Sequence, residues 1–152
     1  MKSLAPSIRT ARPDEKQTLE ALQRRSALNN LGDRDVLLAH LDAIELPACQ
    51  IADGLVYVAE IDDKPVGFAA LLPRSDEAME LDGLFVEPDF WRRGIGQALV
   101  AHCAANTREK GVIVLSVLGN PHAEAFYVSC GFKTEGTEKT PFGVGLRMNL
   151  TL

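Results

Sequence analysis

The chain has 152 residues and a net charge of −5, with 46% hydrophobic and 24% charged residues. This composition is typical of a soluble globular protein, and we expect residues 1–152 to form one domain. The acidic balance disfavours nucleic-acid binding, and no hydrophobic run approaches the roughly 20 residues that cross a membrane. The scattered cysteines and histidines lack metal-ligand spacing, which predicts no metal site, and no export signal is visible, which favours the cytoplasm.

The first half of the chain predicts one strand, two helices and a three-stranded meander. Pro13 suits the first turn of a helix, since its missing N–H costs nothing there. Asp62-Asp63-Lys64 is a tight polar turn between two β-rich runs, which predicts antiparallel neighbours. The expected elements are a strand at 7–11, helices at 13–29 and 33–43, a loop at 45–54, and strands at 55–60, 66–72 and 79–86.

The second half changes its hydrophobic period to 3.6 residues after Gly94, which predicts a helix that ends near Lys110-Gly111. A buried strand at 112–117, a short helix at 120–130 and two final strands follow. The order β-α-α-β-β-β-α-β-α-β-β predicts an α/β (α+β) fold with a mixed, mostly antiparallel sheet of six to seven strands and about four helices. Ligands of such sheets bind at the carboxyl ends of strands, here after Val86 and Val117.

Two glycines and two arginines mark the start of the helix that follows Val86. Gly94 and Gly96 let a ligand approach the backbone, and the free N–H groups of the helix start favour an anion such as a pyrophosphate. Arg92 and Arg93 add cationic donors. A dinucleotide fingerprint is excluded because its sixth position is Leu99, and the P-loop pattern occurs nowhere in the chain. The alternative is that the glycines only turn the chain.

Two motifs carry a resemblance to GCN5-related N-acetyltransferases (the GNAT family). Leu84-Phe85-Val86-Glu87-Pro88 followed by residues 92–99 resembles the acetyl-CoA loop of that family, whose pattern is Q/R-x-x-G-x-G/A. In the natural register the first position is Trp91, a departure, and a register shifted by two residues also matches. Residues 120–132, read as N-x-x-A-x-x-F-Y-x-x-x-G-F, are similar to a second signature of the family. The expected strand order also agrees with that fold.

The resemblance implies that acetyl-CoA is the cosubstrate and that two parts of the chain bind it. Leu84 and Val86 would bond the pantetheine arm as a neighbouring strand does, and the Val86 N–H would stabilise the oxyanion. The expected cofactor-binding residues are Leu84, Phe85, Val86, Arg92, Arg93, Gly94, Ile95, Gly96, Gln97, Ala98 and Asn120. Asn120 also suits a helix N-cap before Pro121, and the two roles are compatible.

Tyr127 and Glu80 are the expected catalytic residues. The family places a tyrosine seven residues after an asparagine, so Tyr127 is the expected proton donor to the departing thiolate. The alternative for Tyr127 is aromatic packing next to Phe126. Glu80 is the leading candidate for the general base, and Asp82 or a water chain are alternatives. A solvated carboxylate without a catalytic role is at least as common on a strand.

The predicted function is transfer of an acetyl group from acetyl-CoA to a primary amine by direct attack on the thioester. A catalytically silent acetyl-CoA sensor is the first alternative, and a plain interaction domain is the second. The acceptor would be a small-molecule or peptide amine, held by Arg25, Ser26, Asn29, Asn30 and residues 137–143. A monomer or a homodimer is compatible with the sequence, and a strictly acetyl donor is an assumption of the resemblance.

Overall fold

The computed structural model describes residues 5–29, 45–140 and 143–152. Three short 3₁₀ turns in these ranges each begin with proline: Pro13–Glu15, Pro88–Phe90 and Pro121–Ala123. The helices are α1 (Lys16–Asn29), α3 (Ala48–Ala52), α4 (Ile95–Glu109) and α5 (Glu124–Ser129). The strands are β1 (Ser7–Thr10), β2 (Val56–Ile61), β3 (Lys64–Pro73), β4 (Ala78–Val86), β5 (Val114–Gly119), β6 (Lys133–Thr140) and β7 (Gly143–Thr151).

The seven described strands form one sheet in the order β1-β2-β3-β4-β5-β7-β6. Neighbouring strands are antiparallel except β4 and β5, which are parallel. Asp62 and Asp63 form the β2–β3 turn with positive φ angles of 51° and 64°, a conformation that aspartate tolerates better than most residues. The mixed, mostly antiparallel sheet with four helices in the described ranges confirms the predicted fold class.

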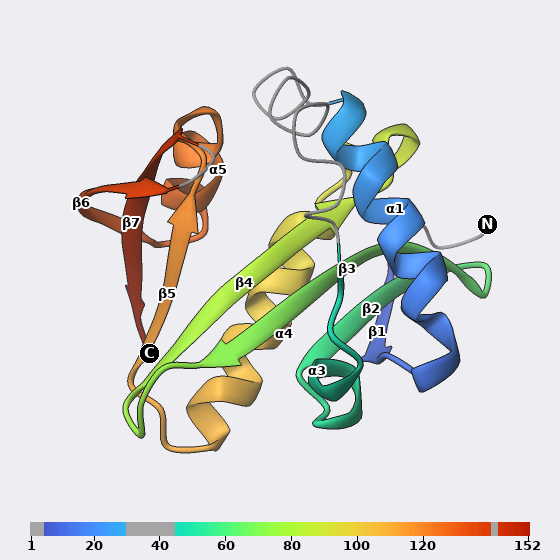
Figure 1. Cartoon of the computed structure of the whole chain (residues 1–152), viewed down its shortest axis with the longest axis horizontal. Helices are drawn as coiled ribbons and strands as arrows, with labels where there is room; N and C mark the ends of the chain where they lie inside the picture. The colour runs from blue at the N-terminus through green and yellow to red at the C-terminus, as the bar shows by residue number, and fades with distance from the viewer. Residues whose placement is uncertain (1–4, 30–44, 141–142) are drawn as a thin grey trace.

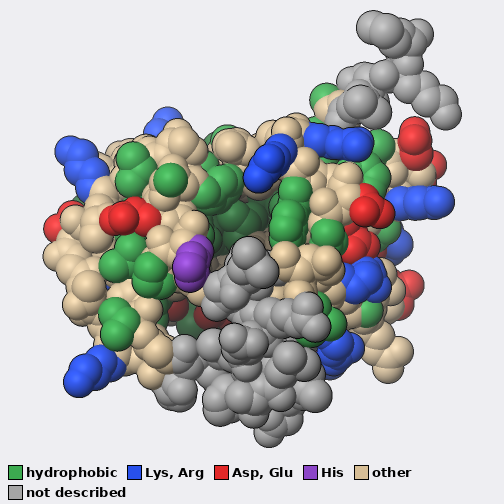
Figure 2. Space-filling model, turned by 90° about the horizontal axis from the view of Figure 1, so that it is seen from above, with side chains coloured by type: hydrophobic (Ala, Val, Ile, Leu, Met, Phe, Trp, Pro, Cys, Tyr) green, Lys and Arg blue, Asp and Glu red, His purple; other side chains and the backbone are tan. Residues whose placement is uncertain are grey.

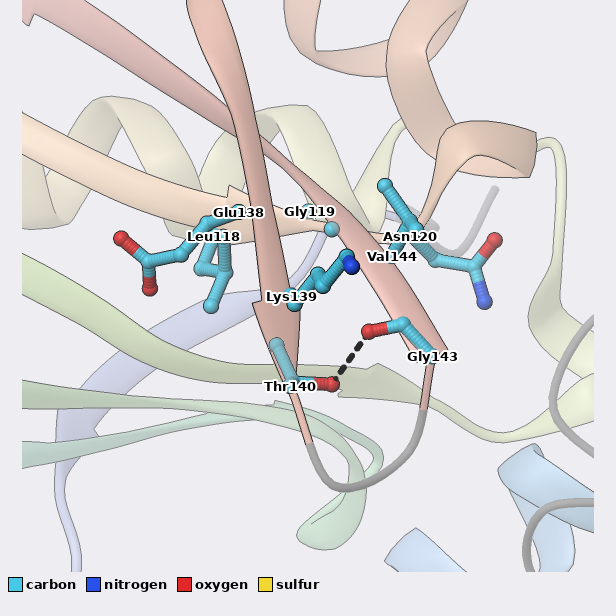
Figure 3. Close-up of a pocket in the computed structure, with 9 residues that line it drawn as sticks. Leu118, Gly119, Asn120, Glu138, Lys139, Thr140, Gly143 and Val144 are labelled. Carbon is cyan, nitrogen blue, oxygen red and sulfur yellow. Dashed lines mark hydrogen bonds between the residues drawn. The ribbon is translucent and has the colours of Figure 1, made fainter.

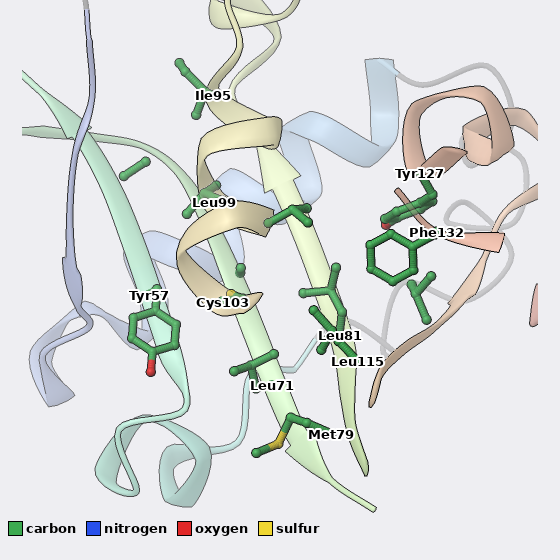
Figure 4. Close-up of a cluster of buried hydrophobic side chains, with 14 of the residues drawn as sticks. Tyr57, Leu71, Met79, Leu81, Ile95, Leu99, Cys103, Leu115, Tyr127 and Phe132 are labelled. Atoms are coloured by element: carbon green, nitrogen blue, oxygen red, sulfur yellow. The ribbon is translucent and has the colours of Figure 1, made fainter. Parts of the chain in front are cut away.

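Helices cover both faces of the sheet, as Figure 1 shows with α1 in front and α4 behind. Leu19 and Leu22 of α1 are fully buried against β2 and β3, together with Ile51 of α3. On the opposite face, α4 packs Ile95, Leu99, Val100 and Cys103 onto the sheet, in a cluster that continues to α5 and β7 (Figure 4). Gly67 of β3 permits this contact, because an added Cβ would lie 3.3 Å from the side chains of both Ile95 and Leu99.

Some predicted elements differ from the structure. The expected loop at 45–54 contains helix α3, whose five residues are too few to show a helical period. Gln50 of α3 is buried and its side chain donates to the Leu71 carbonyl at 2.8 Å, which ties the helix to β3. The strand expected at 112–117 runs from Val114 to Gly119 instead, because Val112 still belongs to the turn after α4, where its N–H donates to the Thr107 carbonyl of that helix. The helix expected at 33–43 lies outside the described residues.

Strand β4 contains a bulge at Asp82. Ala70 of β3 pairs with Gly83, whereas the next residue of β3, Leu71, pairs with Leu81, so Asp82 is the extra residue. Met79 and Leu81 lie in the α4 cluster before the bulge, and Leu84 and Val86 pack against the same cluster after it. The bulge therefore reverses the alternation of faces halfway along β4.

Candidate active site

Strands β4 and β5 separate at the end of the sheet where the predicted site lies. They pair only over three residues each, Ala78–Glu80 with Val114–Ser116. Beyond these pairs β4 stays with β3 and β5 stays with β7, and Figure 1 shows the two strands diverging. Viewed from above, hydrophobic side chains gather in a hollow near the middle of the molecule, with Lys and Arg side chains beside it (Figure 2). The sheet is therefore open between its two halves.

The backbone of β4 faces this opening at alternate residues. The Glu87 N–H bonds to the Val66 carbonyl of β3 at 2.8 Å, so the peptide groups of odd-numbered residues after the bulge face β3. Those of Leu84 and Val86 consequently face the opening. An edge of this kind can pair with an extended ligand that carries amide groups.

The start of α4 has the features of an anion cradle. Gly94 directly precedes the helix with φ of +81° and no side-chain cap, and a Cβ added to it would meet nothing within 4 Å. The first N–H groups of this 15-residue helix thus begin beside open space, where they favour negative charge. Arg92 lies in the same turn with φ of +64°, and the Arg93 guanidinium packs over Phe90 at 5.1 Å.

Gly96 has a packing contact besides its predicted role in cofactor binding. An added Cβ would lie 3.0 Å from the Phe126 ring of α5. Gly96 therefore lets α5 pack against the start of α4. This contact brings the second motif beside the first, although about 30 residues separate them in the chain.

Tyr127 is a buried aromatic residue at the same junction. Its ring forms edge contacts with Phe126 and Phe132, at centroid distances of 5.1 and 5.5 Å, and only 8% of the residue is exposed. Figure 4 shows Tyr127 and Phe132 side by side. A Cβ on Gly119, the last residue of β5, would lie 3.3 Å from the Tyr127 ring, so glycine gives the ring its place. Tyr127 therefore belongs to the hydrophobic core and also lies close to the end of β5.

Asn120 accepts a hydrogen bond from the His122 N–H at 2.9 Å, which confirms its predicted role as an N-cap. The element that follows is not the single helix expected from 120 to 130. It is a 3₁₀ turn, Pro121–Ala123, followed by α5. Two α-helical turns therefore do not connect Asn120 with Tyr127.

Glu80 lies at the paired end of β4, away from the opening. Its carboxylate accepts a hydrogen bond from Arg147 of β7 at 2.7 Å and has Arg74 at 3.8 Å. The bond to Glu80 is the main reason that the Arg147 pKa is raised. Since strands rise about 3.3 Å per residue, Glu80 is on the order of 20 Å from Val86. Glu80 is therefore held in an ion pair with Arg147 at the paired end of β4.

Asp82 is closer to the opening and has no such partner among its main interactions. Desolvation raises its pKa, and a hydrogen bond with Gln50 partly offsets this rise. More than a third of Asp82 remains exposed, so solvent screens the effect. A raised pKa makes a carboxylate a stronger base.

Several of the predicted acceptor residues line two cavities, whereas residues 141 and 142 of the predicted segment lie outside the described residues. A cavity of about 600 Å³ includes Arg25, Asn29 and Glu87, and the Arg25 guanidinium bonds both Glu87 oxygens at 2.9 and 2.7 Å. Ser26 is buried instead, and Asn30 lies outside the described residues. A second cavity of about 490 Å³ lies at the β6–β7 hairpin (Figure 3). Its lining comprises Leu118, Gly119, Asn120, Glu138, Lys139, Thr140, Gly143, Val144 and Gly145.

Other kinds of site find little support in the part of the chain that the structure describes. No three His, Cys, Asp or Glu side chains there are grouped so that they could hold a metal ion. No helix there has both the length and the hydrophobicity of a membrane span. His102 packs its ring against Tyr57 at a centroid distance of 4.8 Å.

Comparison with known proteins identifies the family of this chain. The family model described as acetyltransferase (GNAT) domain matches residues 52–134, which include the opening, the cradle and Tyr127. This chain belongs to the GNAT family. The acetyltransferase is 33% identical over 131 residues to the peptidyl-lysine N-acetyltransferase YjaB of Salmonella typhimurium, covering 86% of this chain and 85% of that protein. The function of this chain is acetyl transfer to an amine, with acetyl-CoA as cosubstrate.

Other relatives agree on family and fold. The [ribosomal protein bS18]-alanine N-acetyltransferase of Salmonella typhimurium is 38% identical over 74 residues, which are 47% of this chain and 49% of that protein. The crystal structure of PaiA N-acetyltransferase from Thermoplasma acidophilum, in complex with coenzyme A, superposes with a TM-score of 0.78 at 20% identity. It covers 98% of this acetyltransferase and 100% of its own chain, which confirms the fold.

Proposed function

We propose that this acetyltransferase modifies the side-chain amine of lysine in a peptide or protein. The observation that carries the proposal is the similarity to the peptidyl-lysine enzyme, which extends over most of both chains. The similarity to the alanine-modifying enzyme covers less than half of each chain. Asp82 and Glu45 border one small cavity beside α3, and their charge would favour a cationic acceptor.

Acetyl-CoA would bind across the opening between β4 and β5. The backbone edge at Leu84 and Val86, which faces the opening, suits the amide groups of the pantetheine arm. The start of α4 suits the pyrophosphate because of its unpaired helical N–H groups and nearby Arg92 and Arg93. Gly94 supports this assignment through its left-handed backbone and the open space around it.

The residues at the opening would act on the thioester in two ways. The Val86 N–H would donate to the oxyanion of the tetrahedral intermediate, and one such donor is typically worth about 3 kcal/mol. Tyr127 would protonate the sulfur of coenzyme A as the carbon–sulfur bond breaks. Its place between Gly119 and Phe126 supports this role, because Gly119 lines a cavity at the end of β5 and Phe126 packs against the start of α4.

The acceptor must lose a proton, because a lysine amine with pKa about 10.4 is almost fully charged at neutral pH. Glu80 is engaged with Arg147, which favours a role in holding β4 to β7 over proton transfer. Asp82, directly or through water, is the better-placed base. Exposure of Asp82 would let the proton pass to solvent.

Three matched acceptors test the proposal. One peptide has a single lysine and a blocked N-terminus, a second has a free α-amine and arginine in place of the lysine, and the third acceptor is a small primary amine. Thiol release and the mass of each product are measured. Acetylation of the lysine peptide alone supports the proposal, and preference for either other amine overturns it. Binding of acetyl-CoA without turnover on any amine would restore the sensor alternative.

The remaining expectations stay predictions. They are that residues 1–152 are one domain, that the protein is a cytoplasmic monomer or homodimer, and that it does not bind nucleic acid.

A further inference from the structure

Trp91, the residue that departs from the family pattern, bonds to the edge of β4. Its indole N–H donates to the Val86 carbonyl oxygen at 2.7 Å. The 3₁₀ turn Pro88–Phe90 reverses the chain between the two residues, with the Phe90 N–H bonded to Glu87 at 2.9 Å. The turn thereby folds the Trp91 side chain back onto the end of β4.

The acceptor of this bond is the carbonyl that faces the opening. Val86 directs its peptide groups away from β3, because the neighbouring Glu87 N–H is the one that bonds to β3. A chain that pairs with a strand runs about 4.8 Å from it. The indole nitrogen is 2.7 Å from the carbonyl oxygen, so the indole lies where a chain paired with β4 would run. An extended ligand and the indole therefore compete for this part of the edge.

The side chain is able to leave this position. Trp91 is 37% exposed, and the pantetheine arm would replace the contacts that the covered part of the indole gives up. The hydrogen bond is also accessible to water, which can replace the indole as donor. Arg92, the next residue, has a left-handed backbone, and the Arg93 side chain packs on Phe90 rather than on the indole.

We propose that Trp91 is a competitor for the pantetheine arm, and that acetyl-CoA displaces its indole from Val86 on binding. The inference rests on the proposed function, specifically on the assignment of the Val86 edge to pantetheine. It adds that Trp91 weakens cofactor binding. It also makes the occupied site distinguishable from the empty site by the surroundings of one side chain.

Tryptophan fluorescence reports the displacement directly, because Trp91 is the only tryptophan in the 152-residue chain. Saturating acetyl-CoA should shift the emission toward longer wavelength as the indole enters water. Adenosine 3′-phosphate 5′-diphosphate, which is coenzyme A without its pantetheine arm, should leave the emission unchanged. An equal change with both ligands, or none with bound acetyl-CoA, would overturn the proposal.

Calorimetric titration of Trp91→Phe gives the second readout. The variant keeps an aromatic ring and loses the donor, so acetyl-CoA should bind about fivefold more tightly, which corresponds to about 1 kcal/mol. The affinity for the nucleotide without the arm should not change. Trp91→Leu, which also lacks the donor, should behave in the same way, and circular dichroism checks that both variants fold.

The outcomes separate the two proposals. No heat of binding from acetyl-CoA with the folded wild-type protein would refute the assigned cofactor site itself. Wild-type binding together with unchanged or weaker affinity in both variants would refute the role of Trp91 alone.

Discussion

Tyr127→Phe tests the assigned proton donor with little damage to the fold. The substitution removes one hydroxyl and keeps the ring, which contacts Phe126 and Phe132 and fills the space beside Gly119. Loss of the hydroxyl's hydrogen bonding should cost about 1 kcal/mol of unfolding free energy. For a chain of this size that is a fall of roughly 2–4 °C in melting temperature.

The effect on turnover should be larger than the effect on stability. A positioned general acid typically contributes about 10²–10⁴ in rate, which is roughly 3–5 kcal/mol of activation free energy. A thiol with pKa about 8.5 leaves fairly well without help, so the loss should lie toward the lower end of that range. Acetyl-CoA affinity should stay nearly constant, because the ring that lines the site is retained.

The assay compares two acetyl donors. Thiol release is followed with acetyl-CoA and with an acetyl thioester of a more acidic thiol, which needs less protonation as it leaves. The deficit of Tyr127→Phe should shrink with the second donor. An equal deficit with both donors would refute general acid catalysis, and a collapse of the melting temperature would show that Tyr127 serves packing.

Three further substitutions test other features of the site. Glu80→Gln should lower the unfolding free energy in urea by about 1–2 kcal/mol, since it leaves the half-buried Arg147 without its main partner. The double variant Glu80→Gln with Arg147→Met should lose less unfolding free energy than the two single variants lose together. The raised pKa of Asp82 means that its proton stabilises the fold below the unfolded pKa of about 3.9, and that this contribution is lost as pH rises through the folded value. Asp82→Asn should therefore raise the melting temperature near about pH 7 but not near about pH 3, and should lower turnover if Asp82 is the base. Gly96→Ala should lower stability by about 1 kcal/mol because its Cβ meets the Phe126 ring, and Phe126→Leu should recover part of that loss in a thermal melt; an unchanged melting temperature would contradict the contact.

Local chemistry made most of the fold predictable. The period of the hydrophobic residues identified α1, α4 and most of the described strands to within a few residues. The polar strand β6 was expected only as the first of two final strands, without bounds. The Asn120-Pro121 pair predicted the N-cap at Asn120, and the polar turn at Asp62 and Asp63 predicted antiparallel strands. Each of these features depends on residues a few positions apart, which is why sequence alone indicates them.

The features that the sequence did not indicate depend on contacts across the fold. Glu80 meets Arg147 over a separation of 67 residues, and nothing local distinguishes it from a free carboxylate. Gly96 faces Phe126 only because α5 packs on α4. The bulge did have a local sign, since Gly83 interrupts a strand pattern directly after Asp82, and an isolated glycine in a strand often marks a bulge.

The bulge at Asp82 gives β4 one residue that no residue of β3 matches. Before it the odd-numbered Met79 and Leu81 face α4, and after it Leu84 and Val86 do. Without this residue, Leu81 and Gly83 would be consecutive and would still pair with Leu71 and Ala70 of β3, so Leu84 and Val86 would stay on the α4 side. What β4 would lose is the local bend and the stronger twist that a bulge gives a strand. The extra residue therefore acts on the direction in which the edge approaches the opening, and not on which side chains enter the core.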